Sequence, residues 1–164
     1  MKLYLMRHGK ANPENIDPGK SLSDVGEKDV TRLAESIGYL DIRVEQIWHS
    51  EKKRAKQTAE IISAAVKPQK GLVEKSGLLP NDQVTRVAKE IIAINADLML
   101  VGHLPFMSKL ASYLLSGDED TCAIDFSAGA VACFEYDKGR WTLCWLVYPG
   151  LFKQKDKHGF YSYH

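Results

Sequence analysis

The chain begins with a short apolar run that leads straight into an arginine and a histidine. Residues 2–6 are mostly apolar, and Arg7, His8 and Gly9 follow without a break. Such a run is typical of a strand buried on both faces, as in a parallel sheet covered by helices. Open α/β sheets bind ligands just beyond the carboxyl ends of their strands. The pattern therefore predicts a cation and an imidazole at a ligand site, where Gly9 lets the backbone approach a bound group.

Size and composition indicate an ordinary globular protein, which we interpret as one domain over residues 1–164. Of the 164 residues, 45% are hydrophobic and 26% are charged, enough to bury a core without disulfides or metals. The net charge of +1 gives no electrostatic basis for binding nucleic acid or an anionic membrane. Cys122, Cys133 and Cys144 show no C-x-x-C spacing, which indicates reduced thiols. With no apolar run of signal or bilayer length, we expect a cytoplasmic protein.

Strand-like and helix-like segments alternate along most of the chain. After the opening run, strand-like segments cover 46–49, 71–74 and 98–101, and each is followed by a helical spacing of apolar residues. The first helix begins at Ser23 or Asp24, either of which can cap it. This alternation predicts an α/β fold in which a mainly parallel sheet carries helices on both faces, with an antiparallel edge.

The last third of the chain has a different pattern. Residues 130–136 and 140–147 are strand-like and are joined by Asp137-Lys138-Gly139, which predicts a hairpin. Along the second strand every other residue is large and apolar, which predicts that these residues share one face: Trp141, Leu143, Trp145 and Val147. The tail, residues 149–164, mixes lysines with aromatic residues, and its pattern leaves open whether it packs onto the domain.

Histidines and arginines from three separate segments converge on the predicted ligand edge. His8 and His103 both follow buried strands, Arg7 precedes His8, and Arg54 lies near the start of the helix at about 52–66. Two guanidinium groups near helix N-termini form a pocket for a dianionic phosphoryl group. Nearby cations disfavour imidazolium, so His8 is expected to be neutral and able to attack phosphorus.

Four ordered segments resemble the motifs of the histidine phosphatase superfamily, which has a phosphoglycerate-mutase-like fold. Together they span Lys2 to about Leu115. They read Leu5-Met6-Arg7-His8-Gly9, Leu22-Ser23-Asp24-Val25-Gly26, Ser50-Glu51-Lys52-Lys53-Arg54-Ala55-Lys56-Gln57-Thr58-Ala59 and Val101-Gly102-His103-Leu104-Pro105.

The resemblance implies a three-layer α/β/α sandwich and a metal-independent phosphatase. It implies that His8 carries a transient phosphoryl group, with Arg7, Arg54 and His103 as the other catalytic residues. The phosphoryl group would be held by Arg7, Arg54, His103 and Gly9, with no metal and no organic cofactor. The short chain, and the lack of a large insertion between Glu74 and Val84, look most like the SixA-type branch of phosphohistidine phosphatases.

One departure from the family pattern bears on the substrate. Many relatives place a carboxylic acid after the third strand to protonate a leaving alcohol, but residues 77–82 contain no glutamate. Asp82 is a possible general acid, although a solvated loop aspartate is the simpler interpretation. A P–N bond breaks without expelling a strongly basic alkoxide, so the missing acid favours phosphohistidine over alkyl phosphates.

Three functions stay open at this point. The protein removes phosphate from phosphohistidine on a protein, hydrolyses a small phosphorylated metabolite with Asp82 as acid, or binds phosphate without catalysis. In each case we expect a monomer with no nucleic acid or membrane partner. Several further residues lie close in sequence to the predicted site or are additional histidines. Ser50 either touches the phosphate or, as we prefer, caps a helix; Lys10 and Asn12 are possible pocket residues; we interpret His49 as structural, and His158 and His164 as tail residues.

Overall fold

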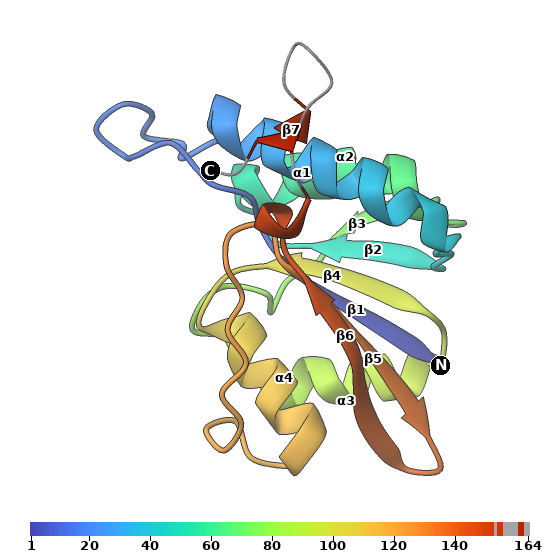
Figure 1. The fold of residues 1–164 in the computed structure, drawn as a ribbon. Coiled ribbons are helices and arrows are strands. Elements are labelled where there is room, and N and C mark those ends of the chain that lie inside the picture. Colours follow the sequence, from blue (N-terminus) through green and yellow to red (C-terminus); the bar gives the residue numbers. More distant parts are fainter. Residues whose placement is uncertain (153, 156–160, 163–164) are drawn as a thin grey trace.

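The computed structural model describes residues 1–152, 154–155 and 161–162, and a six-stranded sheet lies at its centre (Figure 1). The strands are β1 (Lys2–Arg7), β2 (Gln46–His49), β3 (Leu72–Glu74), β4 (Leu98–Gly102), β5 (Val131–Asp137) and β6 (Arg140–Val147). Their order across the sheet is β3-β2-β4-β1-β5-β6. The first four strands in this order are parallel, and β5 and β6 form an antiparallel edge. The predicted α/β fold with a mainly parallel sheet is confirmed.

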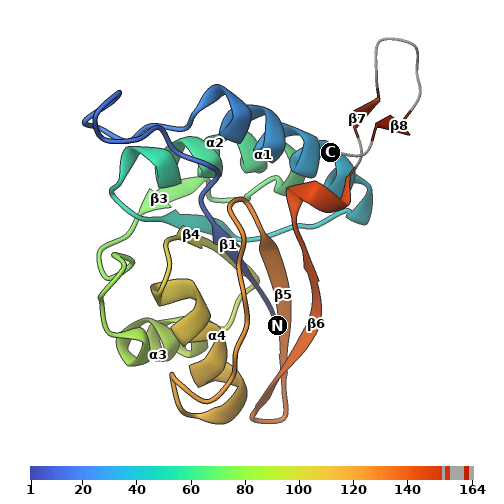
Figure 2. The ribbon, with the colours of Figure 1, turned by 60° about the vertical axis from the view of Figure 1, so that its left-hand side comes forward.

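Four helices cover the two faces of the sheet and complete a three-layer sandwich. They are α1 (Asp24–Ile37), α2 (Lys53–Val66), α3 (Val84–Ile94) and α4 (Phe106–Ser116), with short 3-10 turns η1 (Gly38–Leu40) and η2 (Pro149–Leu151). Helices α1 and α2 lie together on one face, and α3 and α4 lie together on the other (Figures 1 and 2). Within the part of the chain that the structure describes, no helix combines the length and apolar character needed to cross a membrane.

The central strands contribute to two apolar cores, one on each face of the sheet. In β4, Leu98 and Leu100 pack in the core beneath α3 and α4, whereas Met99 and Val101 pack in the core beneath α1 and α2. Successive side chains of a strand point to opposite faces, so a strand buried on both faces must be apolar at every position. This explains the unbroken apolar runs of β1 and β4.

The predicted hairpin of β5 and β6 is confirmed, but the predicted facing of its side chains is wrong. Cys144 is an extra residue on β6 between the positions that pair with Cys133 and Phe134. A bulge of this kind changes which face the following side chains point to. Trp141 therefore belongs to the core beneath α3 and α4, while Trp145 packs against the core beneath α1 and α2.

The segment after β6 begins against the domain. Pro149 in η2 is buried, and η2 contacts α1. Strands β7 (Gln154–Lys155) and β8 (Tyr161–Ser162) then pair as an antiparallel ribbon separate from the main sheet (Figure 2). The rest of the tail, including His158 and His164, lies outside the described residues.

Candidate active site

The site lies where the carboxyl ends of β1, β2 and β4 meet at one edge of the sheet. The β1–β4 pairing ends at Arg7, opposite Gly102, and the next backbone N–H, that of His8, donates to Gly102 O at 2.9 Å. His103 directly follows β4, and Arg54 lies in the first turn of α2, the helix that follows β2. The structure thus brings together three segments that the sequence predicted to converge.

The His8 ring is oriented by the backbone of the next residue. Its Nδ1 lies 2.7 Å from Gly9 O, and because a carbonyl oxygen only accepts, Nδ1 must carry the proton. The other ring nitrogen, Nε2, accepts a hydrogen bond of 3.2 Å from Arg54 Nε. Nε2 therefore presents its lone pair toward the guanidinium group, which is the form that a nucleophilic histidine requires.

His103 faces His8 and is held by a serine. The two ring centroids are 5.0 Å apart, and His103 Nε2 lies 2.8 Å from Ser50 Oγ. Both side chains are buried, with exposed fractions of 2% for His103 and 1% for Ser50. The preferred interpretation of Ser50 as a helix cap is wrong, because the N-cap of α2 is Lys52 and no side chain caps this helix. The Ser50 hydroxyl bonds His103, a contact that sequence reasoning missed.

Arg7 is anchored by a carbonyl group from a distant segment. Its Nη1 donates to Phe126 O at 2.9 Å, and Phe126 is fully buried in the segment between α4 and β5. The same segment approaches His8 again, because Gly129 N–H donates to His8 O at 3.0 Å. The orientation of Arg7 therefore depends on how residues 117–130 are held.

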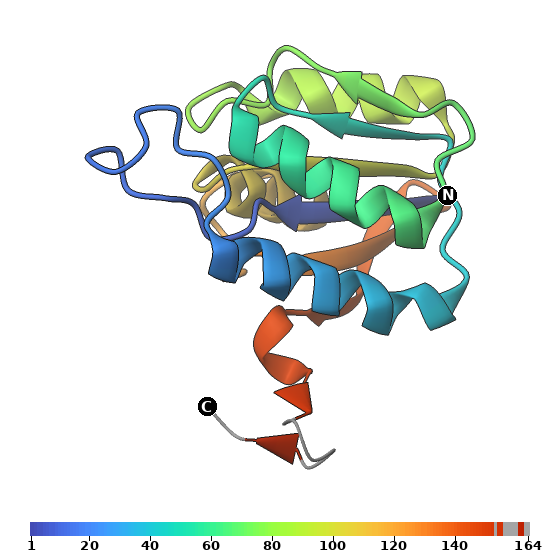
Figure 3. The ribbon, with the colours of Figure 1, turned by 90° about the horizontal axis from the view of Figure 1, so that it is seen from above.

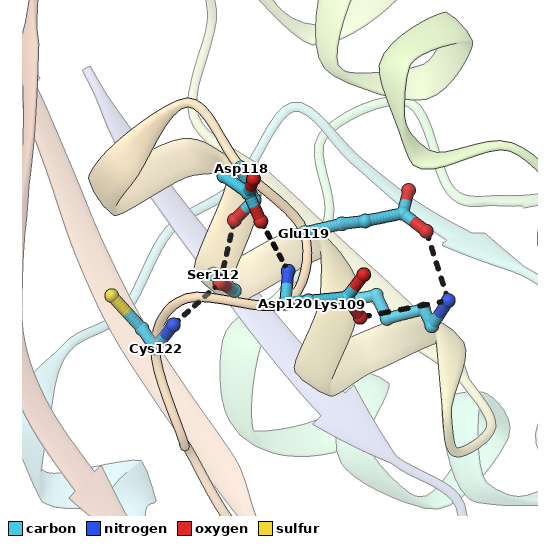
Figure 4. Close-up of polar contacts among 6 residues, drawn as sticks. All are labelled: Lys109, Ser112, Asp118, Glu119, Asp120 and Cys122. Carbon is cyan, nitrogen blue, oxygen red and sulfur yellow. Dashed lines mark hydrogen bonds and ion pairs between the residues drawn. The ribbon is translucent and has the colours of Figure 1, made fainter.

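Helix α4 fixes this segment through its polar face (Figure 4). Ser112 Oγ donates to Asp118 O at 2.6 Å and accepts from Cys122 N–H at 2.8 Å. One turn earlier, Lys109 forms an ion pair of 2.8 Å with Glu119. These contacts tie the start of the segment to α4 and leave Phe126 in place against Arg7.

Two buried nitrogen atoms of the site have no hydrogen-bond partner among the described residues. They are Arg7 Nε and His103 Nδ1, two of the three buried side-chain atoms for which this is so. Buried polar groups in proteins are normally hydrogen-bonded. Two of the four predicted residues thus each leave one nitrogen atom without a partner inside the described part of the site.

Burial and neighbouring cations keep both histidines uncharged. Burial, helped by the Arg54 and Arg7 guanidinium groups, lowers the pKa of His8 to about 4 despite the opposing effect of the bond to Gly9 O. Burial also lowers the pKa of His103 to about 3, with contributions from His8 and the nearby cations. At neutral pH the site thus combines two neutral imidazoles with two guanidinium groups. Fixed positive groups of this kind stabilise the charge of a phosphoryl-transfer transition state.

Gly9 joins the site to the neighbouring helices. Its N–H donates to Thr58 Oγ1 at 3.0 Å, and Thr58 Oγ1 donates to Arg54 O at 2.8 Å. A Cβ at Gly9 would lie 2.7 Å from Val30 Cγ2 of α1, so only glycine fits here without a shift. The Gly9 N–H is already bonded to Thr58, so these bonds do not support a direct contact of Gly9 with phosphate. That contact stays a prediction.

The start of α1 clamps the loop that leaves the site, and this loop projects past the strand ends beside α2 (Figure 3). Ser23 caps α1 as predicted, accepting from Gly26 N–H at 3.0 Å, and its own N–H donates to Lys10 O at 2.9 Å. Asn12 Nδ2 donates to Leu22 O at 3.3 Å. Asn12 thus serves the loop itself, while Lys10 is exposed at the edge of the site.

Asp82 and His49 take part in local structure. Asp82 Oδ2 accepts from Leu79 N–H at 2.8 Å, and within the described residues no hydrogen bond or ion pair joins it to His8, Arg54 or His103. Its role as a general acid therefore stays a prediction. His49 is buried and its Nδ1 bonds Ser50 O at 3.0 Å, in agreement with a structural role.

Part of the chain is similar in sequence to a known family of enzymes. Residues 3–78 match the sequence model of the histidine phosphatase superfamily (branch 1), a stretch that includes the first three of the four motifs. Over this part of its length the chain is similar to the histidine phosphatase superfamily. No curated protein matches it in sequence.

Solved structures share the fold over nearly the whole chain. The protein histidine phosphatase SixA complexed with tungstate superposes with a TM-score of 0.82 at 23% identity, covering 93% of this chain and 100% of that one. A candidate phosphohistidine phosphatase SixA from Agrobacterium tumefaciens gives a TM-score of 0.71 at 22% identity, covering 89% and 96%. A mutant phosphoserine phosphatase from Entamoeba histolytica, in complex with phosphoserine, gives 0.63 at 16%, covering 88% and 95%. At these identities the likeness establishes a shared phosphoglycerate-mutase-like fold.

Proposed function

We propose that the protein is a metal-independent phosphatase that works through a phosphoryl group carried on His8. The observation that carries this proposal is the state of the His8 ring. Nδ1 holds the proton because it bonds Gly9 O, and Nε2 presents its lone pair toward the guanidinium group of Arg54. The lowered pKa of His8, about 4, keeps this nucleophile unprotonated at neutral pH.

The reaction then proceeds in two displacements at phosphorus. Nε2 of His8 attacks in line, a new P–N bond forms, and the bond to the leaving group breaks with its electron pair going to that group. Water next attacks the phosphoryl group, and the P–N bond breaks with its electrons returning to Nε2. One proton of the water is released, and inorganic phosphate leaves. In both steps Arg7, Arg54 and His103 hold the phosphoryl oxygens.

The substrate that we propose is phosphohistidine on a protein, as in the SixA-type proteins. Only nine residues, 75–83, join β3 to α3, so no large insertion lies over this part of the site. Asp82, the one candidate acid of this loop, is engaged with Leu79. A substrate whose leaving group is a ring nitrogen needs less help from an acid than an alkyl ester does.

A panel of substrates tests this proposal. Wild type, His8→Ala and Asp82→Asn are assayed on a phosphohistidine peptide, phosphoramidate, an aryl phosphate and phosphoserine. We expect wild type and Asp82→Asn to hydrolyse the first three alike, phosphoserine to react at least about 100-fold more slowly, and His8→Ala to be inactive. Equal turnover of phosphoserine that is lost in Asp82→Asn would assign the metabolite function instead. Phosphate binding by wild type without turnover of any substrate would indicate a binding module.

A further inference from the structure

The N-terminal end of α2 carries positive charge where a helix favours negative charge. Lys52 is its N-cap, Lys53 and Arg54 are its first residues, and Lys56 follows, while the first turn has no acidic residue and no capping side chain. Helix α1 has the usual arrangement, with a serine cap and two acidic residues in its first turn. Because the helix dipole disfavours cations at this end, α2 is less stable than it could be. The bond to His8 accounts for a cation at position 54. Within the part of the chain that the structure describes, no such bond accounts for the lysines at this end of the helix.

Four exposed lysines lie on two segments that border the candidate site, and we call them the lysine edge. Its members are Lys10, Lys52, Lys53 and Lys56, and all four are exposed. Lys10 lies two residues after His8, on a loop whose base is bonded to α2 through Gly9 and Thr58. Lys52 is near enough to His103 to help lower the pKa of that ring.

The lysines of the lysine edge form few ion pairs, although Lys53 is near enough to Asp17 to help lower the pKa of that carboxyl group. Among the described residues, Lys10, Lys53 and Lys56 form no ion pair, and Lys52 has only a long contact of 3.9 Å with Glu51. The segment across the sheet, after α4, is acidic in contrast. There Glu119 and Asp120 are within 2.8 and 3.9 Å of Lys109 (Figure 4). The exposed lysines of the lysine edge thus lie on the α2 side of the site, and the acidic segment follows α4.

The extent of the lysine edge indicates a ligand larger than one phosphoryl group. That group already has Arg7, Arg54 and His103 around it. Lys53 and Lys56 are three residues apart and share one face of α2, and Lys10 lies on a separate segment. A ligand that meets all of them must extend over the surface beyond the phosphoryl group.

We infer that the lysine edge docks the acidic surface of the protein that bears the phosphohistidine substrate. This inference rests on the proposed function and names the partner by its charge. Carboxylates flanking the phosphohistidine lie against Lys53 and Lys56 while the phosphoryl group enters between His8 and Arg54. Charges outside the reacting centre act mainly on the rate of association and on its dependence on salt.

Synthetic peptides with one phosphohistidine and acidic, neutral or basic flanks test the inference. For wild type at low salt we expect kcat/KM to be about tenfold higher for the acidic than for the basic peptide, with the difference largely lost in 0.5 M salt. In Lys53→Glu/Lys56→Glu the preference should disappear or reverse, while kcat/KM for an aryl phosphate changes less than about threefold. Glutamate suits the first turn of a helix, so this variant should be at least as stable as wild type.

A matched control makes the same change of charge elsewhere. Lys89 on α3 and Arg140 on β6 are exposed and form no ion pair among the described residues, and Lys89→Glu/Arg140→Glu should keep the acidic preference. Equal rates on all three peptides, or a preference that survives Lys53→Glu/Lys56→Glu, would overturn the inference alone. Turnover of the aryl phosphate but of no peptide would overturn the proposed substrate as well. A sugar bisphosphate hydrolysed faster than every peptide, and slowed by Lys53→Glu/Lys56→Glu, would assign the lysine edge to a small polyanion.

Discussion

Ser50 and His103 are both nearly inaccessible to solvent, so water cannot easily replace the hydrogen bond between Ser50 Oγ and His103 Nε2. The same serine oxygen accepts from Lys52 N–H at 3.3 Å, which fixes where the hydroxyl lies at the start of α2. The side chain of Ser50 therefore acts as a positioning group for the second histidine.

Ser50→Ala should lower kcat about tenfold and change KM little, because His103 loses the bond that orients it toward the phosphoryl oxygens. A lost hydrogen bond of this kind is worth about 1–1.5 kcal/mol. Ser50→Thr keeps the hydroxyl and should recover part of the rate. Ser63→Ala, which removes a hydroxyl of α2 that donates to Glu60 O, should leave steady-state kinetics unchanged. An unchanged kcat in Ser50→Ala would show that His103 needs no such support.

Sequence reasoning located the four main residues of the site but not Ser50. His8 and His103 could be predicted because each directly follows an apolar strand, and parallel strands end at one edge of a sheet. Ser50 meets His103 across 53 positions of sequence, through the neighbouring strands β2 and β4. Only the register of that pairing brings the two side chains together, and register is a property of the folded sheet.

At the scale of elements, the close approach of α1 to the loop after β1 fixes the exit from His8. Gly26 allows this approach, because a Cβ there would lie 2.0 Å from Lys10 O. The clash is with backbone, which cannot move aside as a flexible side chain can.

Gly26→Ala should destabilise the protein by about 2 kcal/mol, within the usual range for overpacking, and should lower kcat/KM because the loop that follows His8 is displaced. Urea denaturation and steady-state assays measure the two effects. Gly38→Ala is the control, since a Cβ there meets nothing within 4 Å and the backbone φ of −57° is helical. Equal stability of the two variants would mean that α1 does not hold the loop as described.

The helices and strands could be predicted from the spacing of apolar residues, but the facing of the side chains of β6 could not. The side chains of β6 alternate regularly in sequence, so one continuous face was the natural prediction. The bulge at Cys144 changes strand pairing without altering composition, and it moves Trp141 and Trp145 to different cores. The sequence pattern of β6 cannot reveal that one of its residues is left out of the pairing with β5.

At the scale of the whole molecule, the lowered pKa values of His8 and His103 link stability to pH. In an unfolded chain a histidine has a pKa of about 6.5, whereas the folded values are about 4 for His8 and about 3 for His103. Between pH 6.5 and 4 the unfolded state therefore binds more protons than the folded state. Stability must fall as the pH falls through this window.

Urea denaturation between pH 8 and 5 should show this linkage. We expect the free energy of unfolding to be nearly constant above about pH 7 and to decrease below 6.5. The double variant His8→Gln/His103→Gln should lose most of this dependence, because glutamine does not titrate. A slope identical to that of wild type would mean that other groups cause it and that these rings are not buried as neutral groups.

The proposed function depends most on Nε2 of His8 as the nucleophile that attacks phosphorus. The identity of the residue that becomes phosphorylated tests this most directly. Wild type is mixed with radiolabelled phosphoramidate, quenched in alkali during turnover, digested and sequenced by mass spectrometry. We predict an acid-labile label on Nε2 of His8, present in His103→Ala and absent from His8→Ala. Label on His103, on a serine or on a cysteine, or full turnover by His8→Ala, would contradict the account.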